Sequence, residues 1–213
     1  MRTVTALFDT YDHAASAVRA LKDAGIPSSD ISIVANQSTH ALDGGTHYEI
    51  DTATSAGEGA AAGAGVGAVA GGGAGLLAGL GTLAIPGIGP VVAAGWLVAT
   101  AIGALAGAGV GAAAGSLLGL LANAGVPEAE AHVYAEGVRR GGTLVSARAD
   151  EGRADTVNAI LRNSNGVDVE ARRKDYLKEG WQGFDEDAPA YSEEQIRDYR
   201  SAYNIVPPVI RAG

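Results

Sequence analysis

The chain carries no charged side chain between Gly59 and Pro127, and within this stretch glycine recurs at every fourth position. Each glycine inside a helix costs about 1 kcal/mol relative to alanine, so an isolated helix of this composition is unfavourable in water. Close contact between two helix backbones offsets that cost. The sequence therefore predicts helices that pack along two glycine ladders, which are Gly59, Gly63, Gly67, Gly71, Gly75 and Gly79, and Gly103, Gly107, Gly111, Gly115 and Gly119.

A turn is predicted between the two ladders, because residues 84–90 (AIPGIGP) contain two prolines and two glycines. We therefore expect a helix over 59–84, a tight turn and an antiparallel helix over 91–123, which together form a glycine-zipper helical hairpin at 59–124. A flexible linker is disfavoured, since valine and leucine stand where linkers carry serine and other polar residues. The block has no lysine and no G-x-G-x-x-G pattern, which argues against a phosphate-binding loop.

The length of the hairpin allows it to cross a membrane. Helices over 59–84 and 91–123 would be about 39 Å and about 50 Å long, against a hydrocarbon core of roughly 30 Å. Trp96 near the turn suits an interface, whereas the acidic flanks oppose insertion and Arg139 and Arg140 alone offer a positive-inside signal. The sequence leaves two surroundings open: lipid, or identical hairpins in a soluble oligomer. In both, the two chain ends lie on the same side.

The segments 1–58 and 125–174 flank the hairpin and predict one α+β domain in two halves. Each half reads as a βαβ unit, so we expect a ferredoxin-like sandwich with the hairpin and one further helix inserted between the halves. Asp9 and Asp150 hold matching positions in the two halves and are expected to cap helices. The expected strands are 3–8, 30–35, 143–149 and 167–171, and the expected helices follow Asp9 and span 127–140 and 151–163.

Aromatic residues concentrate in the acidic tail, residues 175–213. Ser192 and Gln195 form a capping-box pattern that predicts a short helix. The aromatic side chains predict docking onto a neighbouring surface. That surface is either another subunit or the α/β domain of the same chain. The expected docking residues are Trp181, Phe184, Tyr191, Tyr199 and Tyr203.

No motif for catalysis, a cofactor or a metal ion stands out. The chain has no cysteine, and its net charge of −9 argues against nucleic acid as a partner. His40 and His47 lie among acidic residues, but their spacing matches no known metal motif, so a solvated loop is the preferred interpretation. His13 and His132 lie near expected helix starts and suit surface or capping roles. We therefore expect a protein that is not an enzyme.

Three segments together resemble the general stress protein family with the YflT-like (heat-induced stress protein) domain. They are a βαβ unit, VTALFDTYDHAASAVRALKDAGIPSSDISIVA, the glycine-rich insert GEGAAAGAGVGAVAGGGAGLLAGLGTLAIPGIGPVVAAG, and the return AGVPEAEAHVYAEGVRRGGTLVSARAD. The resemblance covers about residues 3–172 and implies a bacterial, stress-associated protein with no catalytic residues to transfer. The tail lies outside the shared pattern.

These observations predict a stress-associated structural protein that self-assembles through its glycine-zipper hairpins in or on a membrane. The expected partners are other copies of the chain and membrane lipid. The N-terminus lacks a secretory signal, so the expected location is cytoplasmic or inner-membrane associated. Two alternatives remain: a soluble homo-oligomer with the hairpins as a shared core, and a binding module whose α/β domain senses a ligand.

Overall fold

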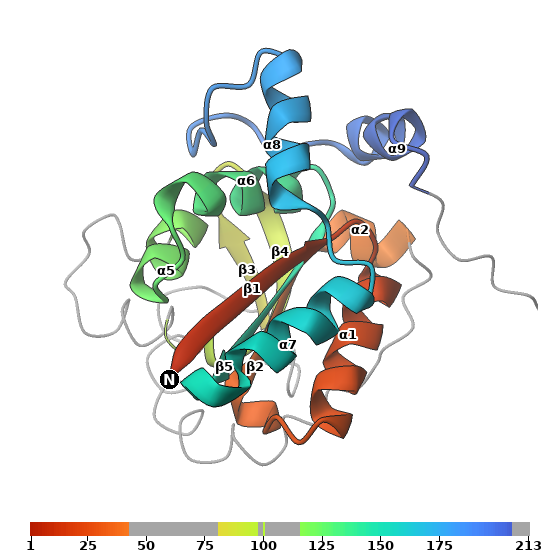
Figure 1. Ribbon diagram of the computed structural model, residues 1–213. Coiled ribbons are helices and arrows are strands. Elements are labelled where there is room, and N and C mark those ends of the chain that lie inside the picture. The colour runs from red at the N-terminus through yellow and green to blue at the C-terminus, as the bar shows by residue number, and fades with distance from the viewer. Residues whose placement is uncertain (43–80, 98–99, 101–115, 206–213) are drawn as a thin grey trace, which may run out of the picture.

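The computed structural model describes residues 1–42, 81–97, 100 and 116–205 of the chain. The described part is an α+β fold around a five-stranded antiparallel sheet with strand order β1-β5-β2-β4-β3 (Figure 1). The strands are β1 Arg2–Phe8, β2 Ile31–Asn36, β3 Gly81–Ile85, β4 Gly89–Gly95 and β5 Thr143–Ala149. The helices are α1 Tyr11–Asp23, α2 Gln37–Leu42, α5 Leu117–Asn123, α6 Glu128–Arg139, α7 Glu151–Asn163, α8 Val169–Lys178 and α9 Glu193–Ala202, with a 3₁₀ turn at Ser28–Asp30.

Helices cover both faces of the sheet, and neighbouring strand residues alternate between the two cores. Phe8 and Val145 face α1 and α7, whereas Leu7 and Leu144 face α5 and α6. This alternation follows from the two-residue period of a strand, and the double coverage explains why every residue of β2 is buried. Burying one such Leu, Val or Phe side chain contributes about 1.5–3 kcal/mol. The sheet is thus the middle layer of three.

The predicted helical hairpin is wrong at its centre, because residues 81–95 form a β-hairpin. β4 pairs with both β2 and β3, so this hairpin extends the sheet rather than leaving it. Pro86 and Gly87 occupy the turn, Gly87 has φ +72°, and the Ile88 N–H donates to the Ile85 carbonyl at 3.1 Å. Proline followed by glycine at positive φ is the pattern of a type II β-turn. The rest of the predicted helix over 59–84 and most of the predicted helix before α5 lie outside the described residues.

The fourth strand of the predicted ferredoxin-like sandwich, expected over 167–171, is absent, so the arrangement of two βαβ units is not established. The Val167 N–H donates to the Leu7 carbonyl at 2.8 Å, and the chain then enters α8. Asp168 caps that helix, since its Oδ1 accepts from the Ala171 N–H at 2.9 Å. An N-cap carboxylate favours a helix start over continued strand pairing. The first βαβ unit does form, with β5 inserted between its two strands.

The two predicted acidic caps differ in outcome. Thr10, not Asp9, caps α1, and its hydroxyl accepts from the His13 N–H at 3.3 Å. Asp150 occupies the N-cap position of α7, although its side chain makes no capping hydrogen bond. The helices expected over 127–140 and 151–163 are observed as α6 and α7, and the strand over 143–149 is β5.

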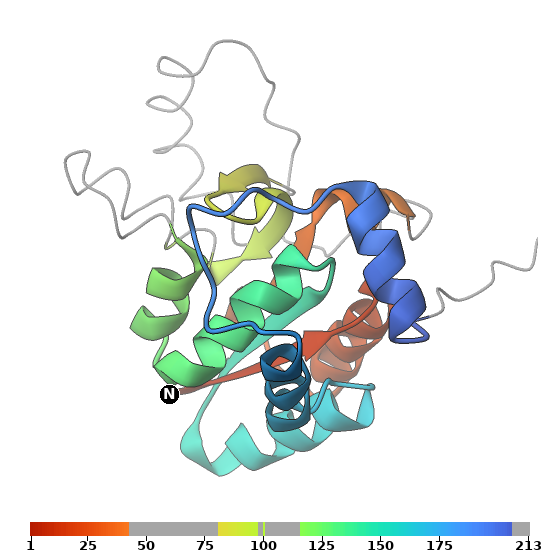
Figure 2. The same ribbon diagram turned by 90° about the horizontal axis from the view of Figure 1, so that it is seen from above.

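After α8 the chain crosses the top of the domain as a strap, which we define as residues 180–203. Figure 2 shows this segment passing from α8 over the β3–β4 hairpin to α9. It approaches the hairpin turn closely: a Cβ atom added to Gly87 would lie 2.7 Å from the Asp185 carbonyl oxygen and 3.0 Å from Glu186 Cα. Glycine at position 87 therefore allows both the positive φ of the turn and the close approach of the strap backbone.

We expect Gly87→Ala to destabilise the fold more than Gly125→Ala. Both glycines have positive φ, at +72° and +83°, so alanine costs about 1–2 kcal/mol at either position. Only at Gly87 does the new methyl group collide with backbone, because nothing lies within 4 Å of a Cβ at Gly125. Denaturant unfolding measures both free energies, and equal losses would contradict the observed approach of the strap.

Candidate functional site

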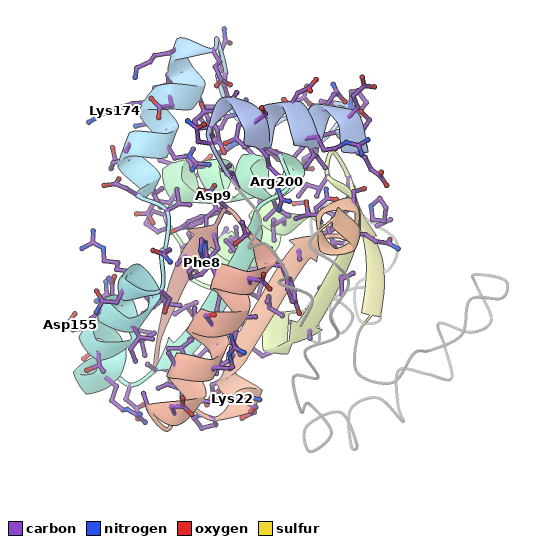
Figure 3. All side chains as sticks on the ribbon, turned by 90° about the vertical axis from the view of Figure 1, so that its right-hand side faces the viewer. Phe8, Asp9, Lys22, Asp155, Lys174 and Arg200 are labelled. Carbon is purple, nitrogen blue, oxygen red and sulfur yellow. The ribbon has the colours of Figure 1, made fainter. Side chains whose placement is uncertain are left out.

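The strongest concentration of chemistry in the described chain lies beneath the strap. There, charged and aromatic side chains from distant segments form two hydrogen-bonded groups that are joined by cation–π contacts, and we call the whole set the clasp. Figure 3 shows Asp9 below α9, which carries Arg200, and the Arg200 guanidinium donates to the Asp9 carbonyl at 3.4 Å. The clasp residues are Asp9, Glu136, Arg140, Arg172, Tyr176, Glu179, Tyr199 and Tyr203.

Arg172 of α8 joins the start of the chain to the strap. Its guanidinium donates to both carboxylate oxygens of Asp9 at 2.8 and 2.9 Å, and to the Tyr199 hydroxyl at 2.8 Å. Burial lowers the pKa of Arg172, but the hydrogen bond to Asp9 and the nearby Tyr199, Asp9 and Tyr176 groups together outweigh that effect, and the pKa lies above its ordinary value. The side chain therefore keeps its charge, and the two-pronged geometry fixes the direction in which the group points.

Arg140, at the end of α6, is the second centre of the clasp. It pairs with the buried Glu136 through Nε at 2.6 Å and with Glu179 through Nη1. Its guanidinium carbon also lies 4.2 Å from the ring centroid of Tyr176 and 5.3 Å from that of Tyr199. A cation with this many partners holds α6, α8 and α9 together.

A hydrogen bond from Tyr203 to Glu179 closes the strap onto its own starting point. The Tyr203 hydroxyl, at the end of α9, donates to Glu179 Oε1 at 2.6 Å. Partial burial and the Glu179 carboxylate both raise the pKa of Tyr203, so the hydroxyl keeps the proton that it donates. Tyr199 donates to the Tyr176 hydroxyl at 3.3 Å, which adds a second aromatic link between α9 and α8.

Between α8 and α9 the strap is fixed at separate points. Phe184 is buried, and its backbone N–H donates to His132 Nδ1 at 3.0 Å. The Pro189 carbonyl accepts from Arg139 at 3.1 Å, and the same guanidinium lies 4.9 Å from the centroid of the Tyr191 ring. Arg139 and Arg140, the pair that suggested a positive-inside signal, are thus engaged in contacts within the chain.

All five predicted docking residues lie in the strap and contact their own chain. Tyr199 and Tyr203 enter the clasp, Phe184 and Tyr191 lie along the crossing, and Trp181 packs edge-to-face on Tyr176 with centroids 5.5 Å apart. These contacts are those of the intramolecular alternative for the tail. Docking onto another subunit stays a prediction.

The predicted glycine contact residues lie outside the described part, apart from Gly119 in the middle of α5. His47 also lies outside it, and His40 is in α2. Among the described residues, no group of three histidine or acidic side chains could hold a metal ion. In that same part of the chain, no helix is both long and apolar enough to cross a bilayer.

The sequence interpretation missed most of the clasp. It assigned Asp9 to a helix cap and gave Arg172, Glu136 and Glu179 no role. Asp9 and Arg172 belong to different segments, and only the fold brings them together. One local signal was present: arginines alternate with tyrosines and acidic residues through α8 and α9.

The surface hollows nearby do not single out a ligand. One of about 400 Å³ is lined by Asp9, Asp168, Arg172 and Tyr203 among others, and a second of about 280 Å³ is lined by His132, Arg173, Leu177 and Trp181. In the first hollow, Arg172 is paired with Asp9 and Asp168 caps a helix. The clasp is therefore built to hold segments of the chain together.

The family model of the heat induced stress protein YflT domain matches residues 3–87. This span runs from β1 to the turn after β3 and leaves out β4, β5, the clasp arginines and the strap. Comparison with curated proteins and with solved structures gives no match. The resemblance expected over 3–172 is thus supported over 3–87, and it suggests a stress-associated role.

Replacing Arg172 with methionine should lower the free energy of unfolding by about 2 kcal/mol, because it removes charge-assisted hydrogen bonds and leaves Asp9 unpaired. Lys178→Met is the matched control on the same helix. Its ion pair with Asp175 is exposed, and such pairs contribute little. Urea unfolding distinguishes the two, and similar small losses would show that the clasp does not stabilise the fold.

Acid should weaken the clasp through Glu179. Burial raises the pKa of this carboxyl, but hydrogen bonds from Arg140 and Tyr203 outweigh it, and the pKa lies below its ordinary value of 4.5. The stabilisation is therefore fully present above pH 4.5 and is lost as the pH falls through the folded-state value.

We expect the difference in unfolding free energy between the parent chain and Glu179→Gln to shrink as the pH falls from 7 toward 3. The measurement is urea unfolding at a series of pH values. A difference that stays constant over that range would contradict the assigned role of the carboxylate.

Proposed function

We propose that this chain is a non-enzymatic structural protein of the stress response that self-assembles through its two glycine ladders, in or on a membrane. The family match supports the stress association. The α+β domain serves as a head that holds the ends of both glycine-rich runs. The clasp supports this assignment, since its charged groups hold segments of the chain together.

One observation carries the proposal: the domain brings together the two ends of the second glycine-rich run. Leu97, just before the run, is buried against Leu120 of α5, just after it, and Trp96 packs against the same pair. The residues that bound this run on its two sides therefore lie at one place on the domain. Gly119 lies in α5 on the returning side, and it is partly exposed.

The same contacts bear on whether the glycine ladders are surrounded by lipid or by other copies of the chain. Several of the large apolar side chains that favoured membrane insertion belong to the domain core, among them Val91, Leu97, Leu117 and Leu121. The ladders outside the described part keep mostly glycine and alanine, which suit backbone contact better than lipid solvation. This observation favours the second candidate, a soluble homo-oligomer with the ladders as its shared core.

The test is the double substitution Gly67→Leu with Gly111→Leu. Two bulky side chains in the ladders should block close backbone contact and convert the assembly to smaller species, measured by light scattering after size-exclusion chromatography. Gly152→Leu is the matched control, because Gly152 lies in the first turn of α7 and nothing lies within 4 Å of a Cβ there. An unchanged particle size in the double variant would overturn assembly through the ladders.

Membrane association is tested separately by fractionation of expressing cells and carbonate extraction. Retention in the membrane fraction supports assembly in a membrane. A uniform particle in the soluble fraction, stable without detergent, supports the soluble candidate.

A further inference from the structure

The strap contacts two elements that flank the same glycine-rich run. Residues 43–80 are preceded by α2, which ends at Leu42, and followed by the β3–β4 hairpin, which begins at Gly81. α9 lies against α2, as Figures 1 and 3 both show. The stretch before α9 lies on the hairpin turn, where a Cβ added to Gly89 would be 2.9 Å from Ala190 Cβ.

The contact between the strap and α2 includes two buried side chains. Ile196 of α9 and Thr39 of α2 are fully buried, and both meet Gly141 at the end of α6. A Cβ added to Gly141 would lie 2.6 Å from Ile196 Cγ2 and 2.8 Å from Thr39 Oγ1. The helix of the strap and α2 therefore both pack closely against Gly141, just after α6.

A buried asparagine joins α2 to the hairpin turn beneath the strap. Asn36, only 3% exposed, accepts from the Ser38 N–H through Oδ1 at 3.0 Å, at the start of α2. Its Nδ2 donates to the Ile88 carbonyl in the turn at 3.5 Å. Movement of either element therefore disturbs the other.

The strap buries few apolar side chains against the domain, and most of its contacts are polar. Its fully or nearly buried apolar side chains are Phe184 and Ile196, and its other contacts described above are hydrogen bonds and ring contacts. Gly180, where the strap begins, has φ +86° and open space around it. Segments with few buried apolar contacts open at lower free energy than the core of a domain.

We infer that the strap is a releasable lock that holds the two ends of the 43–80 run in a fixed relation, with Tyr203 and Glu179 as its latch. When it is closed, α9 and the segment over the turn hold α2 and the β3–β4 hairpin in place. When it opens, both elements loosen together. Any effect of this loosening on assembly rests on the proposed function, whereas the coupling between α2 and the β3–β4 hairpin does not.

Hydrogen–deuterium exchange of the full chain, read by mass spectrometry, tests the lock. Glu179→Ala should speed exchange at least tenfold in α9, α2 and residues 85–91, and leave β5 and α7 unchanged. Tyr203→Phe removes only the latch hydroxyl and should act in the same direction with a smaller effect. Asp175→Ala is the matched control, since Asp175 is an acidic residue one turn before Glu179 and its ion pair is with exposed Lys178.

Faster exchange confined to α9 would overturn the coupling. So would unchanged exchange in both Glu179→Ala and Tyr203→Phe, or a uniform increase across β5 and α7. Particle size measured on the Gly67→Leu, Gly111→Leu double variant separates the two proposals. If the ladder substitutions leave the size unchanged, the assembly proposal fails, while the exchange pattern still decides whether the strap locks α2 and the hairpin.

Discussion

The fold depends on β5, which pairs with β1 along one edge and with β2 along the other. β1 and β2 run parallel and are joined by α1, but they do not pair with each other, because β5 lies between them. Ile31 of β2 thus pairs with Ala147, which follows the whole glycine-rich block in the sequence. Pairing of β2 with β5 closes a long loop, which costs conformational entropy. Burial of the β5 side chains on both faces of the sheet offsets that cost. The segment that matches the YflT domain holds β1 and β2 without this strand, and the described domain therefore needs residues beyond the match.

Once β5 is in place, the top of the domain offers charged side chains that need partners. β5 follows directly from the end of α6, where Glu136 is 1% exposed and Arg140 is 6% exposed. A buried guanidinium and a buried carboxylate are costly unless each is fully bonded. Glu179 and the aromatic rings of α8 and α9 complete that bonding. The strap accordingly covers the buried Glu136–Arg140 pair with the ring of Tyr199, and it also contacts the hairpin turn and α2.

Local patterns predicted the elements that are decided locally. The capping box at Ser192 and Gln195 gave α9, because both reciprocal hydrogen bonds involve neighbours in sequence. α6, β5 and α7 were likewise found from periodicity and glycine stops. The pattern failed at residues 81–95, where small and β-branched residues suited a helix–helix contact as well as a strand. Pairing with β2 favours the strand here, and β2 lies too far away in the sequence for a local pattern to include it. The clasp was missed for the same reason, since Asp9 finds Arg172 only in the finished fold.

The central claim is that glycine faces of different copies meet, and the absence of cysteine from the chain allows a direct measurement. A single cysteine at Gly67 lies on a ladder, and a single cysteine at Gly152 lies on an exposed turn of α7. Disulfides form between chains only when the two backbones approach within about 7 Å. Under mild oxidation, the account predicts rapid interchain cross-linking for Gly67→Cys and little for Gly152→Cys at the same protein concentration. Equal cross-linking of the two variants, or none at Gly67, would contradict assembly through the glycine ladders.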